Sequence, residues 1–505
     1  MTDHRTDHRL VKNNKQIVIE SGQTALESDQ IVSKNNHKNR DFSSSVKDCG
    51  GSKHAVRQGF FGQFAKFENM KKWVKSNVFG QSYLMVTIFR GISVPVRYIL
   101  NWLVARLYGA FVVGAFSTTR AFLDIIVVIA GFGADKTMIH MLGHAYVKGK
   151  KEFIKTFSFL LVIFGIVSVL AGGVVYWLAP FISNIYNKPQ LTVFFQITAI
   201  TIPVLLILIL LQQAFRASKH PFWASAFETV LYNILVVLAI VVLYFVFTDF
   251  SGGIYSKYVK YGFHLGFLIA TGLSMVFAFI VFMLVNKFSF LDIVSALKTI
   301  DFHAGLARLL NIGWTLTLVN IVYLILLNLD RIILPKFVST EQVGVYYIAT
   351  KIGSFVQIIS MAFLTITPPH ISKIIRKSPE MLVDYIKKVT YKMGILTILA
   401  GLFAVVTAQF WLSLLGKDFV SGVTIVFALV IAMTFYNLGS IAGQAVILIG
   451  EHKKLLKGLL LVLFISIFVF YVLGSLFETS GIAVSVVFLM IMQAIVHWYI
   501  LLRHE

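Results

Sequence analysis

Residues 190–213 read QLTVFFQITAITIPVLLILILLQQ, a run without a single charged side chain. At a rise of about 1.5 Å per residue, a helix of this length crosses the roughly 30 Å hydrocarbon core of a bilayer. Similar apolar blocks follow one another along most of the chain. The whole chain is 57% hydrophobic and 13% charged, whereas soluble proteins carry about 25% charge. The composition therefore excludes a soluble enzyme and predicts an all-α polytopic membrane protein.

Twelve segments are long and apolar enough to be transmembrane helices. They are residues 80–105, 109–133, 156–181, 190–213, 222–247, 263–286, 310–334, 342–367, 392–415, 419–447, 456–477 and 480–502. Nineteen Lys and Arg residues lie in the loops after the even-numbered spans up to the tenth, against six in the opposite loops. Because positive loops face the cytoplasm, we expect the N and C termini to be cytoplasmic. The same bias explains most of the net charge of +22, so no nucleic-acid partner is expected.

The chain before the first span divides into two parts. Residues 1–59 are polar and begin with a tandem TDHR repeat, which predicts a disordered cytoplasmic tail and no signal peptide. Residues 60–79 carry Phe and Met at three- and four-residue steps with lysines between them. This pattern predicts a basic amphipathic segment on a surface of anionic membrane lipids, and a simple lead-in to the first span explains it equally well.

An internal repeat relates the two halves of the chain. Gly114 in VGAF corresponds to Gly344 in VGVY, and Arg106 corresponds to Lys336. Since six spans are an even number, both halves enter the membrane from the same side and form a parallel repeat. We therefore expect two six-helix bundles around a central cavity that opens by rocking. The first is expected at residues 80–286 and the second at 310–505, joined by a cytoplasmic linker at 287–309.

Ionisable side chains inside the spans are candidate site residues because each costs at least about 2.5 to 3.5 kcal/mol to insert. They are Arg90, Arg97, Arg120, Asp124, Glu228, Asp330, Arg331 and Lys351. Arg90, Arg120 and Lys351 lie near the middle of their spans. Arg120 and Asp124 are four residues apart, so a private intrahelical pair competes with a cavity role for Arg120. Glu228 fits a partner of Arg90 or Arg97, or an ion or proton site.

Unpaired cations in a central cavity favour an anionic ligand, and guanidinium groups suit phosphate oxygens. The substrate-binding candidates are therefore Arg90, Arg97, Arg120 and Lys351, with Glu228 and Asp124 in pairing or ion-binding roles. The sequence has no GxxxxGK[ST] phosphate loop, HExxH motif or nucleophile elbow. A transporter without a cofactor or metal is expected, coupled to an ion gradient, to membrane potential or to removal of the product. The single cysteine, Cys49, excludes an intramolecular disulfide.

Several short motifs resemble those of polysaccharide biosynthesis flippases in the multidrug/oligosaccharidyl-lipid/polysaccharide (MOP) exporter superfamily. They are RLYG at 106–109 with GAF at 114–116, GFGADK at 131–136, and DRIIL at 330–334 with GVY at 344–346. The chain departs from the family pattern at Ala110-Phe111-Val112 and at Pro335-Lys336. Both departures concern turns.

The resemblance implies a flippase that moves a polyprenyl-pyrophosphate-linked oligosaccharide from the cytoplasmic to the outer leaflet of the cell (inner) membrane. Its partners would be this lipid-linked oligosaccharide and a polysaccharide polymerase. The arginines of the related lipid II flippases that meet the pyrophosphate correspond to Arg90, Arg97 and Arg120 by placement only. Lipid II flippases typically carry fourteen spans, and twelve argue against that branch.

Two other transporters remain as alternatives. A cation-coupled multidrug exporter of the same superfamily needs membrane carboxylates, and Glu228 is the residue on which it would depend. A major-facilitator carrier also has two parallel halves of six spans. Its loop after the second span should read GxxxDRxGRR, which residues 133–138 do not.

Overall fold

The structure is a computed structural model that describes residues 78–132, 134–250, 258–311 and 314–504. Within these ranges the chain forms helices and the turns between them, and no strand. The expected polar tail lies outside the described residues, as does the amphipathic segment except for its last two positions. Both stay predictions.

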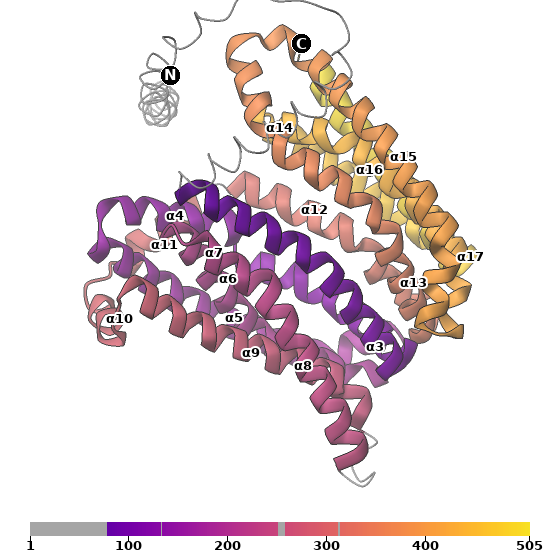
Figure 1. Cartoon of the computed structure of the whole chain (residues 1–505), viewed down its shortest axis with the longest axis horizontal. Helices are drawn as coiled ribbons and strands as arrows, with labels where there is room; N and C mark the ends of the chain where they lie inside the picture. The colour runs from indigo at the N-terminus through magenta and orange to yellow at the C-terminus, as the bar shows by residue number, and fades with distance from the viewer. Residues whose placement is uncertain (1–77, 133, 251–257, 312–313, 505) are drawn as a thin grey trace, which may run out of the picture. The chain divides into compact units, whose positions relative to one another are not determined.

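The first half of the described chain contains the helices α3 to α9, labelled as in Figure 1. Their bounds are α3 Val78–Ala130, α4 Ala134–Lys148, α5 Lys150–Ile185, α6 Thr192–Ala217, α7 Pro221–Ser225, η2 Ala226–Val230, α8 Leu231–Phe245, η3 Val246–Phe250 and α9 Val259–Asn286. Helix α6 packs against α5 and α9, α8 packs against α9, and α3 and α4 pack on α6.

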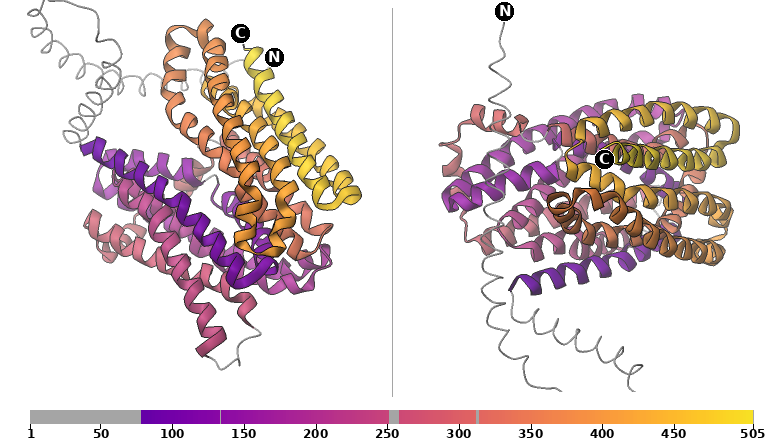
Figure 2. Two further views of the ribbon diagram at one scale, coloured as in Figure 1. Left: turned by 45° about the vertical axis from the view of Figure 1, so that its right-hand side comes forward. Right: turned by 90° about the horizontal axis from the view of Figure 1, so that it is seen from above.

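Two short helices, α10 (Phe290–Leu297) and α11 (Phe302–Asn311), connect the halves. The second half contains α12 Trp314–Ile333, η5 Leu334–Lys336, α13 Thr340–Gly353, η6 Ser354–Val356, α14 Gln357–Lys377, α15 Leu382–Leu415, η8 Lys417–Gly422, α16 Val423–Ile449 and α17 His452–Leu502. Helix α16 contacts α13, α14, α15 and α17, and α12 packs on α17. Figure 2 shows α15 to α17 as long helices lying side by side in both views.

In the described ranges, ten helices are long and apolar enough to cross a membrane. Two of them reverse direction without a loop: α3 has a non-helical backbone at Gly109 and α17 at Glu478. Each therefore holds two helical arms, which explains why the sequence shows more apolar segments than the structure shows continuous helices. The all-α fold with many membrane helices is confirmed, whereas the count of twelve and the side of the termini stay predictions.

Large apolar side chains cover the outward faces of these helices. Trp177 is 79% exposed, Val406 73% and Phe464 70%. A soluble protein would bury such residues, and a membrane protein turns them toward lipid tails. The buried faces carry apolar side chains as well, together with small residues and hydroxyls such as Ser117 and Thr118 of α3, which let membrane helices pack closely.

The two halves meet where α3 packs against α12 and α13 (Figure 1). The equivalent glycines of the internal repeat form this contact. A Cβ atom on Gly114 would lie 1.8 Å from the carbonyl oxygen of Thr340, and one on Gly344 would lie 2.0 Å from that of Ala110. Only glycine at both positions lets the two backbones approach so closely.

Three hydrogen bonds join the halves beside this contact, and we name them the interhalf latch. The Tyr186 hydroxyl donates to the carbonyl oxygen of Ile332 at 2.8 Å, and the Lys336 ammonium to that of Ile185 at 2.6 Å. The Lys188 ammonium donates to the carbonyl oxygen of Val338. The latch lies at the end of the helices that the charge pattern predicts to face outside, so it holds the halves together there.

Candidate functional site

Gly109 determines how far along its membrane-spanning arm Arg120 lies. Its φ of 75° and ψ of 175° break α3 into two arms, and a positive φ of this size favours glycine. The second arm begins there and carries Arg120 eleven positions further along, about 16 Å from the turn at 1.5 Å per residue. Arg120 therefore lies near the middle of its arm.

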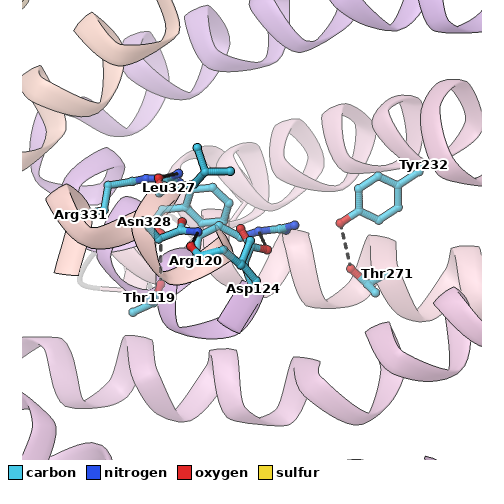
Figure 3. Close-up of polar contacts among 10 residues, drawn as sticks. Thr119, Arg120, Asp124, Tyr232, Thr271, Leu327, Asn328 and Arg331 are labelled. Carbon is cyan, nitrogen blue, oxygen red and sulfur yellow. Dashed lines mark hydrogen bonds and ion pairs between the residues drawn. The ribbon is translucent and has the colours of Figure 1, made fainter. Parts of the chain in front are cut away.

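Arg120 pairs with Asp124 on the next turn of the same helix. The Arg120 Nε donates to Oδ1 of Asp124 at 2.7 Å, and each side chain is 28% exposed. The guanidinium carbon lies 5.2 Å from the ring centre of Phe267 on α9. In Figure 3 the guanidinium points toward Tyr232 of α8, whose hydroxyl lies 3.4 Å from that of Thr271. We call these five residues the Arg120 cluster.

The second half of the chain contributes a polar group beside this cluster. Helix α12 packs on α3, and in the view of Figure 3 its residues Asn328 and Arg331 lie on the side of Arg120 opposite Tyr232. Arg331 donates through its side chain to the carbonyl oxygen of Leu327, at 3.4 Å. The Oδ1 atom of Asn328 is buried and has no hydrogen-bond partner among the described residues. The second half thus contributes a buried amide oxygen and a guanidinium group from a helix that packs on α3.

Asp330 is held in place by hydrogen bonds. It is 9% exposed, accepts from the Tyr346 hydroxyl at 3.1 Å and accepts from the backbone NH of Arg331 at 2.8 Å. Its Oδ1 also lies 3.9 Å from Nε of Arg331. The Asp330 carboxylate therefore offsets part of the Arg331 charge, from a longer distance than the 2.7 Å at which Asp124 pairs with Arg120. The candidate site is less positive than the sequence suggested.

Lys351 occupies a different pocket. Its ammonium lies 4.5 Å from the ring centre of Tyr347, and no ion pair to it occurs among the described residues. The Tyr98 hydroxyl donates to the Lys351 carbonyl oxygen at 2.9 Å. Beside it lies a pocket of about 520 Å³ between α3, α13 and α15, lined mainly by apolar side chains such as Trp102 and Trp411. The Tyr347 ring lies 6.4 Å from that of Phe116 on the second arm of α3.

The remaining candidates are Glu228, Arg97 and Arg90. Glu228, on the π-helical turn η2, forms an ion pair with Arg216 of α6, a partner that the sequence argument did not consider. Arg97 is exposed on α3. The backbone of Arg90 belongs to α3, but its side chain lies outside what the structure describes. The described ranges contain no group of three His, Cys, Asp or Glu residues that could hold a metal ion.

Two buried histidines were missed by the sequence argument, although each is a lone polar residue in an apolar helix. His264 of α9 lies 3.1 Å from the Thr119 hydroxyl, one residue before Arg120. His497 of α17 makes contacts of 2.6 Å with the Tyr323 hydroxyl and 3.0 Å with the carbonyl oxygen of Gly439. Both histidines are 3% exposed, and they tie neighbouring helices together.

Comparisons with known proteins agree with this architecture. Residues 79–375 match the family described as "Polysaccharide biosynthesis protein", which covers more than half of the chain. A comparison with curated proteins finds no match.

Several solved structures have a similar fold. One is described as "Lipid II flippase MurJ, inward closed conformation", with a TM-score of 0.64 and 14% identity over 82% of this chain and 87% of that chain. Another is an inward-facing multidrug resistance MATE family transporter of the MOP superfamily, with a TM-score of 0.59 and 16% identity over 81% and 93%. The MATE transporter VcmN of Vibrio cholerae in its bent form has a TM-score of 0.52 and 13% identity over 84% and 97%.

At these identities the solved structures establish the fold, while the family match covers both the first half and the beginning of the second. The resemblance found in the sequence motifs is confirmed. The chain is a multi-pass membrane protein that belongs to the polysaccharide biosynthesis protein family and has the helical fold of the MOP superfamily of transporters.

Proposed function

We propose that this protein is a flippase that moves a polyprenyl-pyrophosphate-linked oligosaccharide from the cytoplasmic to the outer leaflet of the cytoplasmic membrane. The oligosaccharide would then serve cell-surface polysaccharide synthesis, in company with a polymerase. The membership of the polysaccharide biosynthesis family supports this proposal. So does the fold, because one relative with the same fold is described as a lipid II flippase.

The observation that carries the proposal is the position of Arg120. Its guanidinium is partly exposed near the middle of a membrane-spanning arm, with aromatic rings and hydroxyls around it. One nitrogen is held by Asp124, which fixes the side chain in place. A fixed guanidinium of this kind presents its other nitrogens to phosphate oxygens with a planar fork geometry. The negative charge of Asp124 offsets part of the attraction between Arg120 and the pyrophosphate. We therefore propose that Arg120 orients the pyrophosphate as well as binding it.

Export of cationic drugs is the competing function. It requires a carboxylate that is free to bind a cation. Within the described membrane helices, Asp124, Glu228 and Asp330 each have an arginine partner. These pairs leave little negative charge for a cationic substrate, and for that reason we prefer the anionic lipid.

The test uses cells that lack the gene and carry either the wild-type chain or a variant. Arg120→Ala removes the guanidinium, Arg120→Lys keeps the charge without the fork, and Arg106→Ala is a control on the same helix near the Gly109 turn. We expect Arg120→Ala to accumulate the polyprenyl-pyrophosphate-linked oligosaccharide and to lose surface polymer at unchanged protein level. Arg120→Lys should show an intermediate effect and Arg106→Ala none.

A normal lipid pool in Arg120→Ala cells would exclude Arg120 as a substrate ligand. A normal lipid pool in the deletion strain itself would exclude the flippase. Efflux of a cationic dye that depends on Glu228 would instead favour the multidrug exporter.

A further inference from the structure

A second polar pocket lies at the opposite end of the first half from the interhalf latch. Three helix connections meet there, namely α4 to α5, α6 to α7 and α9 to α10. Each contains a residue with a left-handed backbone: Gly149, Lys219 and Lys287 have φ values of 116°, 63° and 53°. The pocket has a volume of about 430 Å³, and its walls include Tyr146, Lys150, Phe153, His220, Asn286 and Phe288. The charge pattern predicts that this end faces the cytoplasm.

One lysine, Lys150, lines the pocket, and a second, Lys219, lies against the Tyr146 ring that forms one of its walls. The Lys150 ammonium donates to the carbonyl oxygen of Lys287 at 2.8 Å and lies 5.2 Å from the ring centre of Phe288. The Lys219 ammonium lies 5.7 Å from the ring centre of Tyr146. None of these lysines forms an ion pair with a described carboxylate. Aromatic faces and a carbonyl oxygen hold the ammonium groups in place and leave their charge uncompensated.

The second half of the internal repeat provides a comparison. His220 corresponds to His452 there, and the same turn contains Glu451. Glu451 accepts from Lys454 at 2.9 Å and lies 3.4 Å from Nδ1 of His504. The turn in the second half therefore contains an acidic residue that pairs with one of its lysines, whereas Lys150 and Lys219 have no such partner among the described residues. A bound anion would supply the negative charge that the turns around the first pocket lack.

The surroundings of the pocket identify the source of that ligand. Phe288 leads directly into α10, where Phe290 is 65% exposed and Leu291 is 74% exposed. Leu284, at the end of α9, is 72% exposed. Apolar side chains exposed beside lysines and aromatic rings are typical of a segment at the membrane interface, where anionic lipid headgroups lie.

We propose that this pocket binds the phosphate of an anionic membrane lipid headgroup. Lys150 and Lys219 contact the phosphate, and Tyr146 and Phe288 form the walls between which the headgroup enters. The site is separate from the Arg120 cluster and does not depend on the identity of the transported substrate.

The test measures binding of phosphatidylglycerol to the purified full chain in detergent, through the rise in Tm during a titration. Phosphatidylcholine and inorganic phosphate are the comparison ligands. The pocket variant is Lys150→Gln with Lys219→Gln. The matched control is Lys453→Gln with Lys457→Gln. It removes the same charge from the corresponding turn of the second half and leaves the Glu451–Lys454 pair intact.

We expect the pocket variant to bind phosphatidylglycerol about fivefold more weakly for each lysine removed, because each is worth about 1 kcal/mol near an anionic lipid. The control should bind like the wild type. Equal losses in both variants would overturn the proposal, since they would reflect general surface charge. Inorganic phosphate as effective as the lipid would overturn the lipid assignment in favour of a free anion. If the double variant fails to fold in phosphatidylcholine, Lys219→Gln alone decides the question, since the only described contact of its side chain is with the Tyr146 ring.

Discussion

The close contact between Gly114 and Gly344 leads to a prediction about how the halves separate. Gly114→Ala places a Cβ atom 1.8 Å from the carbonyl oxygen of Thr340 and 2.9 Å from the backbone nitrogen of Gly344. Backbone atoms cannot rotate away, so α3 and α13 have to move apart by more than about 1 Å. Overpacking of this kind costs roughly 1–3 kcal/mol, and the cost falls only on the state in which the helices touch.

A penalty on the closed state shifts the equilibrium toward a state in which the interhalf latch is open. A difference of about 1–3 kcal/mol corresponds to a roughly 5- to 150-fold change in population. The assay labels a cysteine placed at Val338, a residue 6% exposed whose backbone carbonyl accepts from Lys188. The background chain carries Cys49→Ser, and a membrane-impermeant maleimide is added from outside.

Gly114→Ala should raise the labelling rate of Val338→Cys within this range, and Gly344→Ala should act in the same direction. Gly165→Ala is the control, because a Cβ atom there meets nothing within 4 Å. Unchanged labelling in both interface variants, at a normal yield of folded protein, would refute the reasoning. It would mean that the two glycines do not pack together in the membrane.

Three further predictions concern charged groups. Burial in the closed interhalf latch lowers the pKa of Lys188 from 10.5 to about 8. As pH rises, the Lys188 ammonium therefore loses its proton at a lower pH in the latched state than in the open state. The latch should therefore tighten as pH rises from about 8 to 10.5, and labelling of Val338→Cys should slow relative to the same chain with Lys188→Met. Burial, with the nearby Arg308, lowers the pKa of His144 below 6.5, and the neutral ring lies 3.2 Å from the Arg308 guanidinium. The contact between α11 and α4 is thus stable above pH 6.5 and weakens as pH falls below it. Amide hydrogen exchange at residues 302–309 should therefore become faster at low pH than its intrinsic pH dependence explains. The variant His144→Gln should not show this increase. Finally, Asp124→Asn leaves the Arg120 charge without its acidic partner near the middle of a membrane-spanning arm, so stability should fall by about 3 kcal/mol; an unchanged Tm would show that the pair does not stabilise the fold.

The sequence predicts the membrane class well because the apolar runs are long and the hydrophobic effect depends on composition. The internal repeat also corresponds to a contact in the structure. Gly114 and Gly344 were matched by sequence alone, and each packs against the helix of the other. The spacing of Arg120 and Asp124 allowed the pair that the structure contains, because residues four apart on a helix lie on one face.

Partners between distant segments could not be predicted in this way. Glu228 pairs with Arg216 because α6 and η2 lie together, and no periodicity links residues twelve apart across a turn. The same holds for Asp330 with Tyr346 and for His497 with Tyr323. Each depends on helix packing, which a single sequence does not specify. The latch was missed for a related reason, since its acceptors are all backbone carbonyls and leave no signal in the sequence.

The central claim is that Arg120 takes part in moving a pyrophosphate-linked oligosaccharide across the membrane. The most direct measurement reconstitutes the purified chain in liposomes that contain this lipid in both leaflets and follows how much becomes accessible to a glycosidase added outside. We predict that the wild type and Arg106→Ala expose nearly the whole pool, while Arg120→Ala exposes only the part that began in the outer leaflet. Equal exposure by Arg120→Ala and the wild type would contradict the role of Arg120, and no exposure beyond protein-free liposomes by the wild type would contradict the flippase itself.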